Sequence, residues 1–522
     1  MPKRIIWLDQ YLLTALAGFL LIFIHLYPKW PLFDILPGYN VRVRLEDILI
    51  LLANGCLLIQ LFRRRIRIKQ APLFKPILGY LLIGLLSVIS AILITKTVYH
   101  EWIQIAKAGL HWFRRAEYFS LFFIFFFGLR SVRQLRLFLM ILVTAVLGVT
   151  VYGFGQKYLY WPAYSTMNRE FAKGIALYLT EHARVLSTFG GHFDLAAYVM
   201  MTIIPLILLM FLLKSLIGRL VLLLLVLAEY WLLILSASRT SWLAYIAGIT
   251  VAFGILLLKK SRSWVFWRWL AIVVISTGIM ISFGDLSERF SHIFKLAGVK
   301  QVLLRPFRQP PKNGIPLAQN LTPEQQLSLV ATQTDIPPSP AKEPVKPLDV
   351  YDDTYERLQA YLASTSGEVF NVNYSQNALK YGLSAGIRLD TLWPNAIKAF
   401  KRNPLLGTGY STLVKEHVWE FTIAESTDND FLRMLGETGL LGLISFLMIL
   451  YWAVRRLWQA FLKSKDPFQY GLLASGVAIT IGLLVNAMYI DVFESSKIAY
   501  TYWSILGLLL GLAEIVVYAK KT

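Results

Sequence analysis

The sequence predicts an all-α polytopic membrane protein with one large loop outside the membrane. Hydrophobic residues make up 56% of its 522 residues, and the mean hydropathy is +0.56. A bilayer core needs about 20 apolar residues per helix, and stretches of that length recur along the chain. One long polar stretch, residues 284–430, interrupts them. These observations predict a bundle of membrane helices whose large extracytoplasmic loop bears short helices of its own.

We expect about twelve transmembrane helices. About nine lie in residues 1–283, before the polar loop, and about three in residues 431–522. The first apolar stretch is long enough to span and has no clear cleavage site, so we expect no cleavable signal peptide. The least typical span carries Arg114, Arg115 and Glu117. The expected limits are 5–27, 45–62, 73–95, 109–127, 137–157, 194–213, 219–236, 239–258, 266–283, 431–454, 470–490 and 498–518.

Basic residues gather in alternate connections between these spans. By the positive-inside rule such connections face the cytoplasm. Both termini are therefore expected in the cytoplasm, and residues 158–193 and 284–430 outside, for a multi-pass protein of the cytoplasmic membrane. The basic residues on the expected inner side are Lys3, Arg4, Arg63 to Lys69, Arg130, Arg133, Arg136, Lys214, Arg219, Lys259, Lys260, Arg262, Arg455, Arg456, Lys463, Lys465, Lys520 and Lys521.

The net charge of +21 is explained mainly by this asymmetry and by attraction to anionic lipid. We therefore expect no nucleic-acid partner. The single cysteine, Cys56, lies in an apolar helix, which excludes an intrachain disulfide and a cysteine-cluster metal site.

The long outer loop changes composition along its length. Residues 305–350 are rich in Pro, Gln and Lys, cannot bury a core and predict a flexible insertion. From Tyr351, the pattern DDTYERLQAYL predicts a short amphipathic helix. Further on, LDTLWPNAIKAF predicts a second helix that Asn403-Pro404 ends. The loop is too long for a simple connector, so it must have an organisation of its own.

Two arginines stand where outer connections return to the membrane. Arg184, in RVLSTFGGHFDLAAY, could hold a phosphate oxygen with its fork of donors, or could be an interfacial anchor. His192 in the same stretch is either an ordinary interfacial histidine or a direct participant. Arg239, in SASRTSW, lies against the positive-inside bias. Its alternative role is a pair with an intramembrane carboxylate, although Glu229 is about two to three helical turns away.

A third arginine precedes a glycine turn. Arg388, in GIRLDTLW, begins the helix before NPLLGTG, and by itself a solvated helix charge is its default interpretation. Gly407 and Gly409 permit positive φ and close approach of the backbone, which predicts a structural turn. The turn lacks the Lys and Ser/Thr of a phosphate P-loop.

Carboxylates and an amide crowd the point where the chain re-enters the membrane, in STDNDFLRMLGETGLLGL. Charged groups at this boundary are costly unless they are solvated or used, so the cluster predicts a site. Helix capping is the alternative for Asp428 or Asp430. Glu437 is about two turns inside the expected span, where capping does not explain it.

These segments, in this order, resemble the O-antigen ligase and polymerase family of bacterial envelope glycosyltransferases. The family's arginine before a GTF-like stretch is matched by Arg184 in RVLSTFGG, and its SR dipeptide at the start of a span by Arg239. Its Arg, Trp and PLLGxG turn are matched by Arg388, Trp393 and NPLLGTG. Its His-Asn-x-aromatic-Leu run and ExGxxG are matched by DNDFL and by the stretch from Glu437. The resemblance covers about residues 180–445, and the layout of spans agrees with a GT-C-like fold.

The resemblance implies transfer of a glycan from a polyprenyl (undecaprenyl) pyrophosphate carrier to an acceptor hydroxyl, with inversion. From the residues and the resemblance together, we expect Arg184, Arg239, Arg388, His192 and Asn429 to bind pyrophosphate or substrate. We expect Asp428 to be the catalytic residue, with Glu437 and Asp430 near enough to share its role. Ligases of the family have a histidine where this chain has Asp428, which favours a polymerase or related transferase of surface polysaccharide or lipopolysaccharide synthesis. A carboxylate can still accept a proton from a sugar hydroxyl.

The partners implied are the lipid-linked glycan, an acceptor glycan or glycolipid, the bilayer and, for a polymerase, a chain-length regulator. No metal or other cofactor is expected, because arginines can stabilise the leaving charge. A lipid-linked oligosaccharide flippase or another transporter is the main alternative, and an inactive scaffold is a third. A transporter is expected to carry charges along a central path and broken helices near mid-bilayer. In this sequence the polar groups gather instead at the outer boundary.

Overall fold

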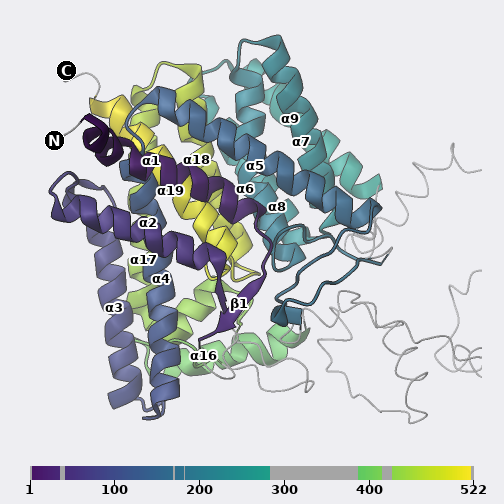
Figure 1. Cartoon of the computed structure of the whole chain (residues 1–522). Helices are drawn as coiled ribbons and strands as arrows, with labels where there is room; N and C mark the ends of the chain where they lie inside the picture. Colours follow the sequence, from purple (N-terminus) through teal and green to yellow (C-terminus); the bar gives the residue numbers. More distant parts are fainter. Residues whose placement is uncertain are drawn as a thin grey trace, which may run out of the picture.

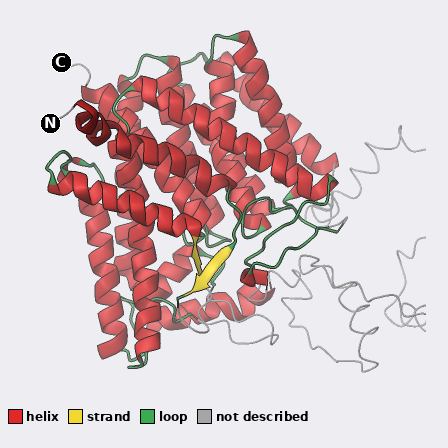
Figure 2. Cartoon of the chain, viewed as in Figure 1, coloured by secondary structure: helices red, strands yellow, loops and turns green. Residues whose placement is uncertain are grey.

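Helices dominate the described part of the chain, which also holds one short pair of strands (Figures 1 and 2). The computed structural model describes residues 3–35, 42–167, 171–180, 183–282, 386–413 and 426–518. Strands β1 (Pro31–Asp34) and β2 (Arg42–Arg44) pair antiparallel just before the second helix. The flexible insertion expected at 305–350 and the helix expected from Tyr351 lie outside the described residues.

Each expected span coincides with a helix, which confirms the all-α polytopic fold. Ten described helices are long and apolar enough to cross a membrane. The other two are α1, whose apolar part is Tyr11–Leu26, and α4, which carries the charges noted above. The helices are α1 (Lys3–Leu26), α2 (Leu45–Phe62), α3 (Phe74–Leu93), α4 (Trp102–Gly128), α5 (Val132–Tyr158), α6 (His192–Leu212), α7 (Leu216–Leu235), α8 (Arg239–Leu256), α9 (Arg262–Ser282), α17 (Asp430–Lys463), α18 (Pro467–Ala487) and α19 (Ser496–Tyr518).

The two termini lie at one end of the bundle, and the connections expected outside the cytoplasm meet at the other end (Figure 1). Hydrogen bonds join these connections: Val185 N–H donates to Leu235 O at 3.1 Å. The Lys497 ammonium donates to the carbonyls of Tyr27 at 2.6 Å and Thr188 at 2.7 Å. We call this end the outer end and the opposite one the inner end.

Helices α6, α18 and α19 form the centre of the bundle. They are the most deeply buried of the ten spans, and α6 is apolar on every side, which is typical of a helix enclosed by others. Helix α18 packs on α6 and α8, and α19 packs on α4. The outer ends of these central helices therefore place residues 188–194 and 486–497 near the middle of the outer end.

Helix α17 is broken near its outer end. Gly439 has φ 67° and ψ −167°, a conformation that residues with a side chain rarely adopt. The break separates a short outer segment, 430–438, from the long apolar part, which runs on to Lys463, beyond the expected end at residue 454. Glu437 therefore lies in the outer segment, immediately before the break, and not within a continuous span.

Helix α16 (Trp393–Arg402) follows a π-helical turn at Arg388–Leu392 and ends just before Asn403, as expected from the Asn-Pro pair. It is amphipathic: Ala396 is buried, while Lys398 and Lys401 are exposed. In Figure 1 it lies across the outer end, at the foot of the bundle, where it packs on α17.

The orientation is testable by cysteine labelling. Tyr99, in the α3–α4 connection, is 71% exposed, and Arg65, at the opposite end, is also exposed. In a Cys56→Ser background, we expect Tyr99→Cys to react with a membrane-impermeant maleimide in cells whose cytoplasmic membrane is intact. Arg65→Cys should react only after that membrane is opened. The reverse pattern would place the outer end in the cytoplasm.

Candidate functional site

The glycine turn, residues 403–410, is hydrogen-bonded to the outer segment of α17. Thr408 N–H donates to Gly436 O at 2.8 Å, and Gly409 N–H donates to Glu437 O at 2.9 Å. Gly407 has φ +67° and Gly409 has φ +93°. A Cβ on Gly407 would lie 2.4 Å from the carbonyl carbon of Glu437. Gly407 is thus required where the two backbones approach, and Gly409 is required by its positive φ and by Ala91 of α3, whose Cβ would lie 2.5 Å from an added Cβ.

Helix α3 holds the other side of this turn. The Ser87 hydroxyl lies 2.6 Å from Leu406 O and 2.8 Å from Glu437 O. Beyond the end of α3, the Thr97 hydroxyl donates to Thr408 O at 2.5 Å. The turn is therefore wedged between α3 and α17.

Tyr410, at the end of the turn, is buried between α3 and α4. A Cβ at Gly84 of α3 would lie 2.3 Å from its hydroxyl oxygen. The Arg115 guanidinium of α4 lies 3.9 Å from the centre of its ring. Burial raises the pKa of Tyr410 well above its ordinary value, so the phenol stays neutral.

The Glu437 carboxylate is the centre of a buried ionic network. Arg115 Nη2 lies 3.0 Å from it, Arg433 Nε lies 3.4 Å from it, and Ser411 N–H donates to it at 3.2 Å. Arg115 Nη2 also contacts Glu494 at 2.6 Å. The network joins α4, α17, the glycine turn and the α18–α19 connection.

Asp491 extends this network to the chain around Asp428. Its carboxylate accepts from Thr427 N–H at 3.1 Å and from Asn429 N–H at 2.8 Å, and it also binds Arg433 Nη1 at 3.0 Å. Two backbone donors that flank Asp428 are thus held by one side chain from the α18–α19 connection.

Asp428 is the most accessible carboxylate of this group. Its side chain is 34% exposed, whereas that of Glu437 is 2% exposed. Asp428 has φ +50°, a region in which Asp and Asn are the least strained residues after glycine. Its carboxylate lies 2.9 Å from Arg388 Nη2, and the Arg388 guanidinium lies 4.5 Å from the centre of the Tyr489 ring.

Asn429 is the N-cap of α17. Its Oδ1 accepts from Leu432 N–H at 3.0 Å, and its Nδ2 donates to Met488 O at 2.9 Å. The capping role that the sequence offered for Asp428 or Asp430 is therefore filled by the residue between them. Asp430 is buried, and its carboxylate accepts from Phe493 N–H at 3.1 Å.

The other two arginines lie at the same outer end. Arg184 Nη1 is 3.0 Å from His192 Nε2, and both side chains are buried. Because a guanidinium can only donate, His192 accepts through Nε2. Arg239 begins α8, two residues before Ser241, whose hydroxyl donates to Asn486 Oδ1 at 3.1 Å. The structure thus brings Arg388 against Asp428 and Arg184 against His192.

A further basic group lies beside α6 and α19. Lys29 is buried and its ammonium donates to the Ser496 hydroxyl, while Arg44 lies 3.6 Å from Glu46. Burial, and next the charge of Arg44, lower the pKa of Lys29 to about 8. Together with Arg184 and Lys497, these cations make the outer end a favourable place for an anion.

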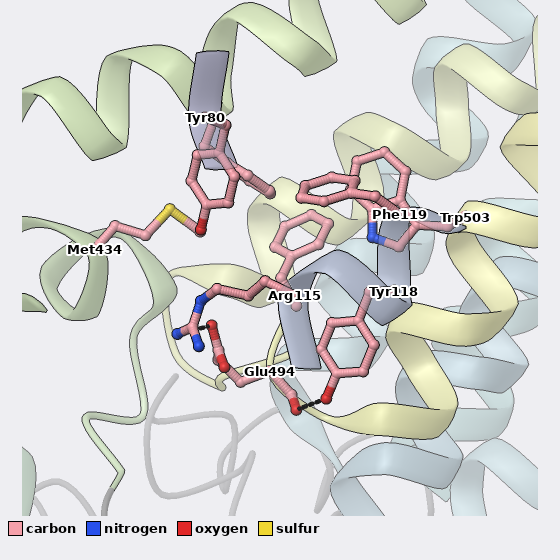
Figure 3. Close-up of a pocket in the computed structure, with 9 residues that line it drawn as sticks. Tyr80, Arg115, Tyr118, Phe119, Met434, Glu494 and Trp503 are labelled. Atoms are coloured by element: carbon pink, nitrogen blue, oxygen red, sulfur yellow. Dashed lines mark hydrogen bonds and ion pairs between the residues drawn. The ribbon is translucent and has the colours of Figure 1, made fainter. Parts of the chain in front are cut away.

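Figure 3 shows a small cavity beneath the ionic network, lined by side chains of α3, α4, α17 and α19 and by the loop before α19. Arg115 points across it toward Glu494, whose backbone carbonyl accepts from the Tyr118 hydroxyl at 2.9 Å. It has room for about one water molecule. The cavity is therefore part of the supporting structure and not a substrate pocket.

Sequence reasoning missed Arg115, Arg433, Asp491 and Tyr489 as parts of this site. In the sequence Arg115 is a charged residue in an otherwise apolar span, and that departure is the available signal. Arg433 lies one helical turn before Glu437 in the same motif. Its charge at the start of an expected span is a similar departure from the apolar pattern. Asp491 and Tyr489 had no local pattern that linked them to residues 388–437.

The sequence also matches a known family over part of its length. Residues 220–447 match the family described as O-antigen ligase. The stretch includes Arg239, Arg388, Asp428 and Glu437, whereas Arg184 lies before it. A comparison with curated proteins found no significant match.

The close backbone approach at the glycine turn is testable by adding a methyl group. Gly407→Ala and Gly439→Ala each place a Cβ 2.4 Å from a backbone carbon at a positive φ. We expect each to destabilise the protein by about 2 kcal/mol or more, from strain and overpacking. Gly79→Ala in α3 is the control, because its Cβ would meet nothing within 4 Å. Thermal unfolding in one detergent measures the three, and equal unfolding temperatures would contradict the geometry.

Proposed function

We propose that this chain, a multi-pass membrane protein with an O-antigen ligase domain at residues 220–447, is a glycosyltransferase. It transfers a glycan from a polyprenyl-pyrophosphate carrier to an acceptor hydroxyl on the outer face of the cytoplasmic membrane. The observation that carries the proposal is the pair between Arg388 and the partly exposed Asp428 at the outer end, 2.9 Å apart. The Arg388 guanidinium can bind an anionic leaving group, and the Asp428 carboxylate can accept the proton of a hydroxyl.

Asp428 is the proposed base. The acceptor oxygen attacks the anomeric carbon, the bond from that carbon to the pyrophosphate oxygen breaks, and Asp428 takes the hydroxyl proton. The pyrophosphate leaves with the bonding electron pair, and the anomeric configuration inverts. Asp430 is less suited to this role, because its carboxylate is buried and bonded to Phe493 N–H.

Arg388, Arg184 and Arg239 are the proposed pyrophosphate ligands. Guanidinium groups bind phosphate oxygens in pairs and stabilise the charge that develops on the leaving group. In the ligand-free site Arg388 is paired with Asp428. When pyrophosphate takes over Arg388, the Asp428 carboxylate is released to accept a hydrogen bond from the acceptor hydroxyl. Binding of the donor would therefore prepare the base.

Glu437 is the proposed positioning residue. Its contacts to Arg115, Arg433 and the glycine turn leave no free side for substrate, and its side chain is 2% exposed. Asp428 in place of the family histidine favours a polymerase or related transferase over a ligase. A polymerase would also work with a chain-length regulator.

Arginine-to-lysine variants test whether the arginines act through their planar guanidinium fork or through their positive charge alone. We expect Arg184→Lys, Arg239→Lys and Arg388→Lys each to lower transfer, because lysine keeps the charge but loses the planar fork. Loss of one charge-stabilising donor typically costs about a hundredfold or more in rate. Transfer from lipid-linked donor is the measurement, and Arg268→Lys, on the lipid-facing helix α9, is the control. Normal transfer by all three variants would leave the arginines as interfacial anchors.

Asp428→Asn tests the base. Asparagine tolerates the positive φ, and the cap is Asn429, so the variant should fold and express like the parent. We expect its transfer to fall by about a hundredfold or more, because the proton acceptor is lost. Asp466→Asn, a cap at the inner end, is the control and should transfer normally.

Cells provide the second readout for the same variants. Single-unit capped product with accumulated lipid-linked units would indicate a polymerase. Uncapped acceptor with polymer still on lipid would indicate a ligase. Full activity of Asp428→Asn would mean that the base lies elsewhere, and no accumulation of lipid-linked glycan on removal of the protein would contradict the proposed function itself.

A further inference from the structure

The connection between α2 and α3, residues 63–69, carries an unusual concentration of charge at the inner end. Five of its seven residues are basic, and all five side chains are exposed. Ile66 points the other way, is 8% exposed and belongs to the hydrophobic core. We call residues 63–69 the basic loop; its cations are Arg63, Arg64, Arg65, Arg67 and Lys69.

The backbone of the basic loop has a defined shape. Arg65 N–H donates to Gln60 O at 3.0 Å, and Arg64 N–H donates to Leu61 O at 2.9 Å. This pair of bonds is the Schellman ending of a helix, in which the residue at the position of Arg64 adopts positive φ. Arg64 has φ +55°. The cations are thus presented from an ordered turn.

Arginine is an unfavourable choice at that position. Glycine is the usual residue there because a Cβ is strained at positive φ. A side chain at Arg64 therefore strains the backbone, and its charge beside the helix C-terminus offsets part of that strain. Within the described ranges, no ion pair or hydrogen bond of the Arg64, Arg65 or Arg67 side chain is present. Their charged groups are exposed and open to a partner outside the fold.

An apolar strip of α2 leads directly to the basic loop. Leu51, Leu58 and Phe62 share one face of the helix and are 63%, 52% and 85% exposed. Gly55 lies between them on that face, and a Cβ there would meet nothing within 4 Å, so it forms a notch in the strip. Helix α2 packs on α1 and α4 and leaves this face uncovered.

We propose that the basic loop and this strip bind an anionic phospholipid, such as phosphatidylglycerol, with its phosphate on the arginines and an acyl chain along α2. Phosphate diesters match the guanidinium fork in charge and geometry. A soluble acidic partner would account for the cations alone, whereas a lipid accounts for both the cations and the apolar strip that continues from them. The proposal is independent of the reaction at the outer end.

Binding is measured on the full chain in a non-ionic detergent. The protein is titrated with phosphatidylglycerol or phosphatidylcholine, and bound lipid is counted by native mass spectrometry. We expect the anionic lipid to bind more tightly. Replacing Arg64, Arg65 and Arg67 by Gln should weaken its binding by about a hundredfold, at about fivefold for each charge.

The matched control removes three charges from another inner loop. Lys259 already donates to Leu462 O at 2.9 Å and Ser464 O at 3.1 Å, and Lys260 lies over Trp264. Replacing Lys259, Lys260 and Arg262 by Gln gives the same net charge as the first variant, and we expect it to bind phosphatidylglycerol within about twofold of the parent. Equal losses in both variants would reduce the effect to net charge and overturn the proposal.

Arg64→Gly separates a role in folding from a role in binding. Glycine relieves the strain, so without anionic lipid its unfolding temperature should equal or exceed that of the parent, while its binding of phosphatidylglycerol falls by about fivefold. A lower unfolding temperature with unchanged binding would make Arg64 a structural cation at a helix C-terminus. Stabilisation by inorganic phosphate or a soluble acidic polymer equal to that by phosphatidylglycerol would also overturn the proposal.

Discussion

A carboxylate that is 2% exposed is stable only where cations and N–H groups replace its water, and Glu437 obtains all of its partners from other parts of the outer end. Arg115 reaches it from α4, Arg433 from one turn before it, and Ser411 N–H from the chain after the glycine turn. Removing one partner of such a buried pair typically costs about 3–5 kcal/mol, since the remaining charge is left unpaired. The positions of α4, of the broken helix α17 and of the glycine turn therefore depend on one another through this carboxylate. The break at Gly439 lets the short segment that carries Glu437 turn away from the long apolar part of α17.

Differences in exposure divide the carboxylates of the outer end into two groups. Glu437 and Asp491 are enclosed, and each has at least three donors in fixed directions. Asp428 is partly open to solvent and pairs with one arginine. The enclosed groups can hold the backbone in place without meeting a substrate, whereas the open one can exchange its partner. Preorganised dipoles and charges of this kind need not rearrange when charge develops during a reaction. The enclosed group also holds the backbone of Asp428. Both flanking N–H groups donate to Asp491, and these hydrogen bonds offset the strain of the positive φ of Asp428.

The spans could be predicted from the sequence because apolar length is a local signal, and each one coincides with a helix. The neighbourhood of Arg388 and Asp428 followed from the order of motifs, although a direct pair did not. The partners of Glu437 were beyond reach, since Arg115 is 322 residues away and no local pattern connects them. The sequence does not identify Asn429 as the cap of α17. The positive φ of Asp428 excludes Asp428 from that role, and nothing in the sequence DND indicates that φ. The fold uses in ion pairs the charged residues that make α4 the least typical span. Their departure from the apolar pattern is therefore the sequence signal for this part of the site.

The two ends of the bundle use arginine in opposite ways. At the outer end Arg115, Arg388 and Arg433 are buried, and carboxylates 2.6 to 3.4 Å away compensate them. Because each arginine is paired with a carboxylate, the two charges nearly cancel at a distance. They therefore act only over short distances on a bound substrate. At the inner end the arginines of the basic loop are exposed, and screening by salt limits their mutual repulsion to about 10 Å. Exposed charge costs the fold little and remains open to partners outside it. Buried charge is fixed by its partners, so a change in Glu437 or in either arginine that binds it is felt by the whole network.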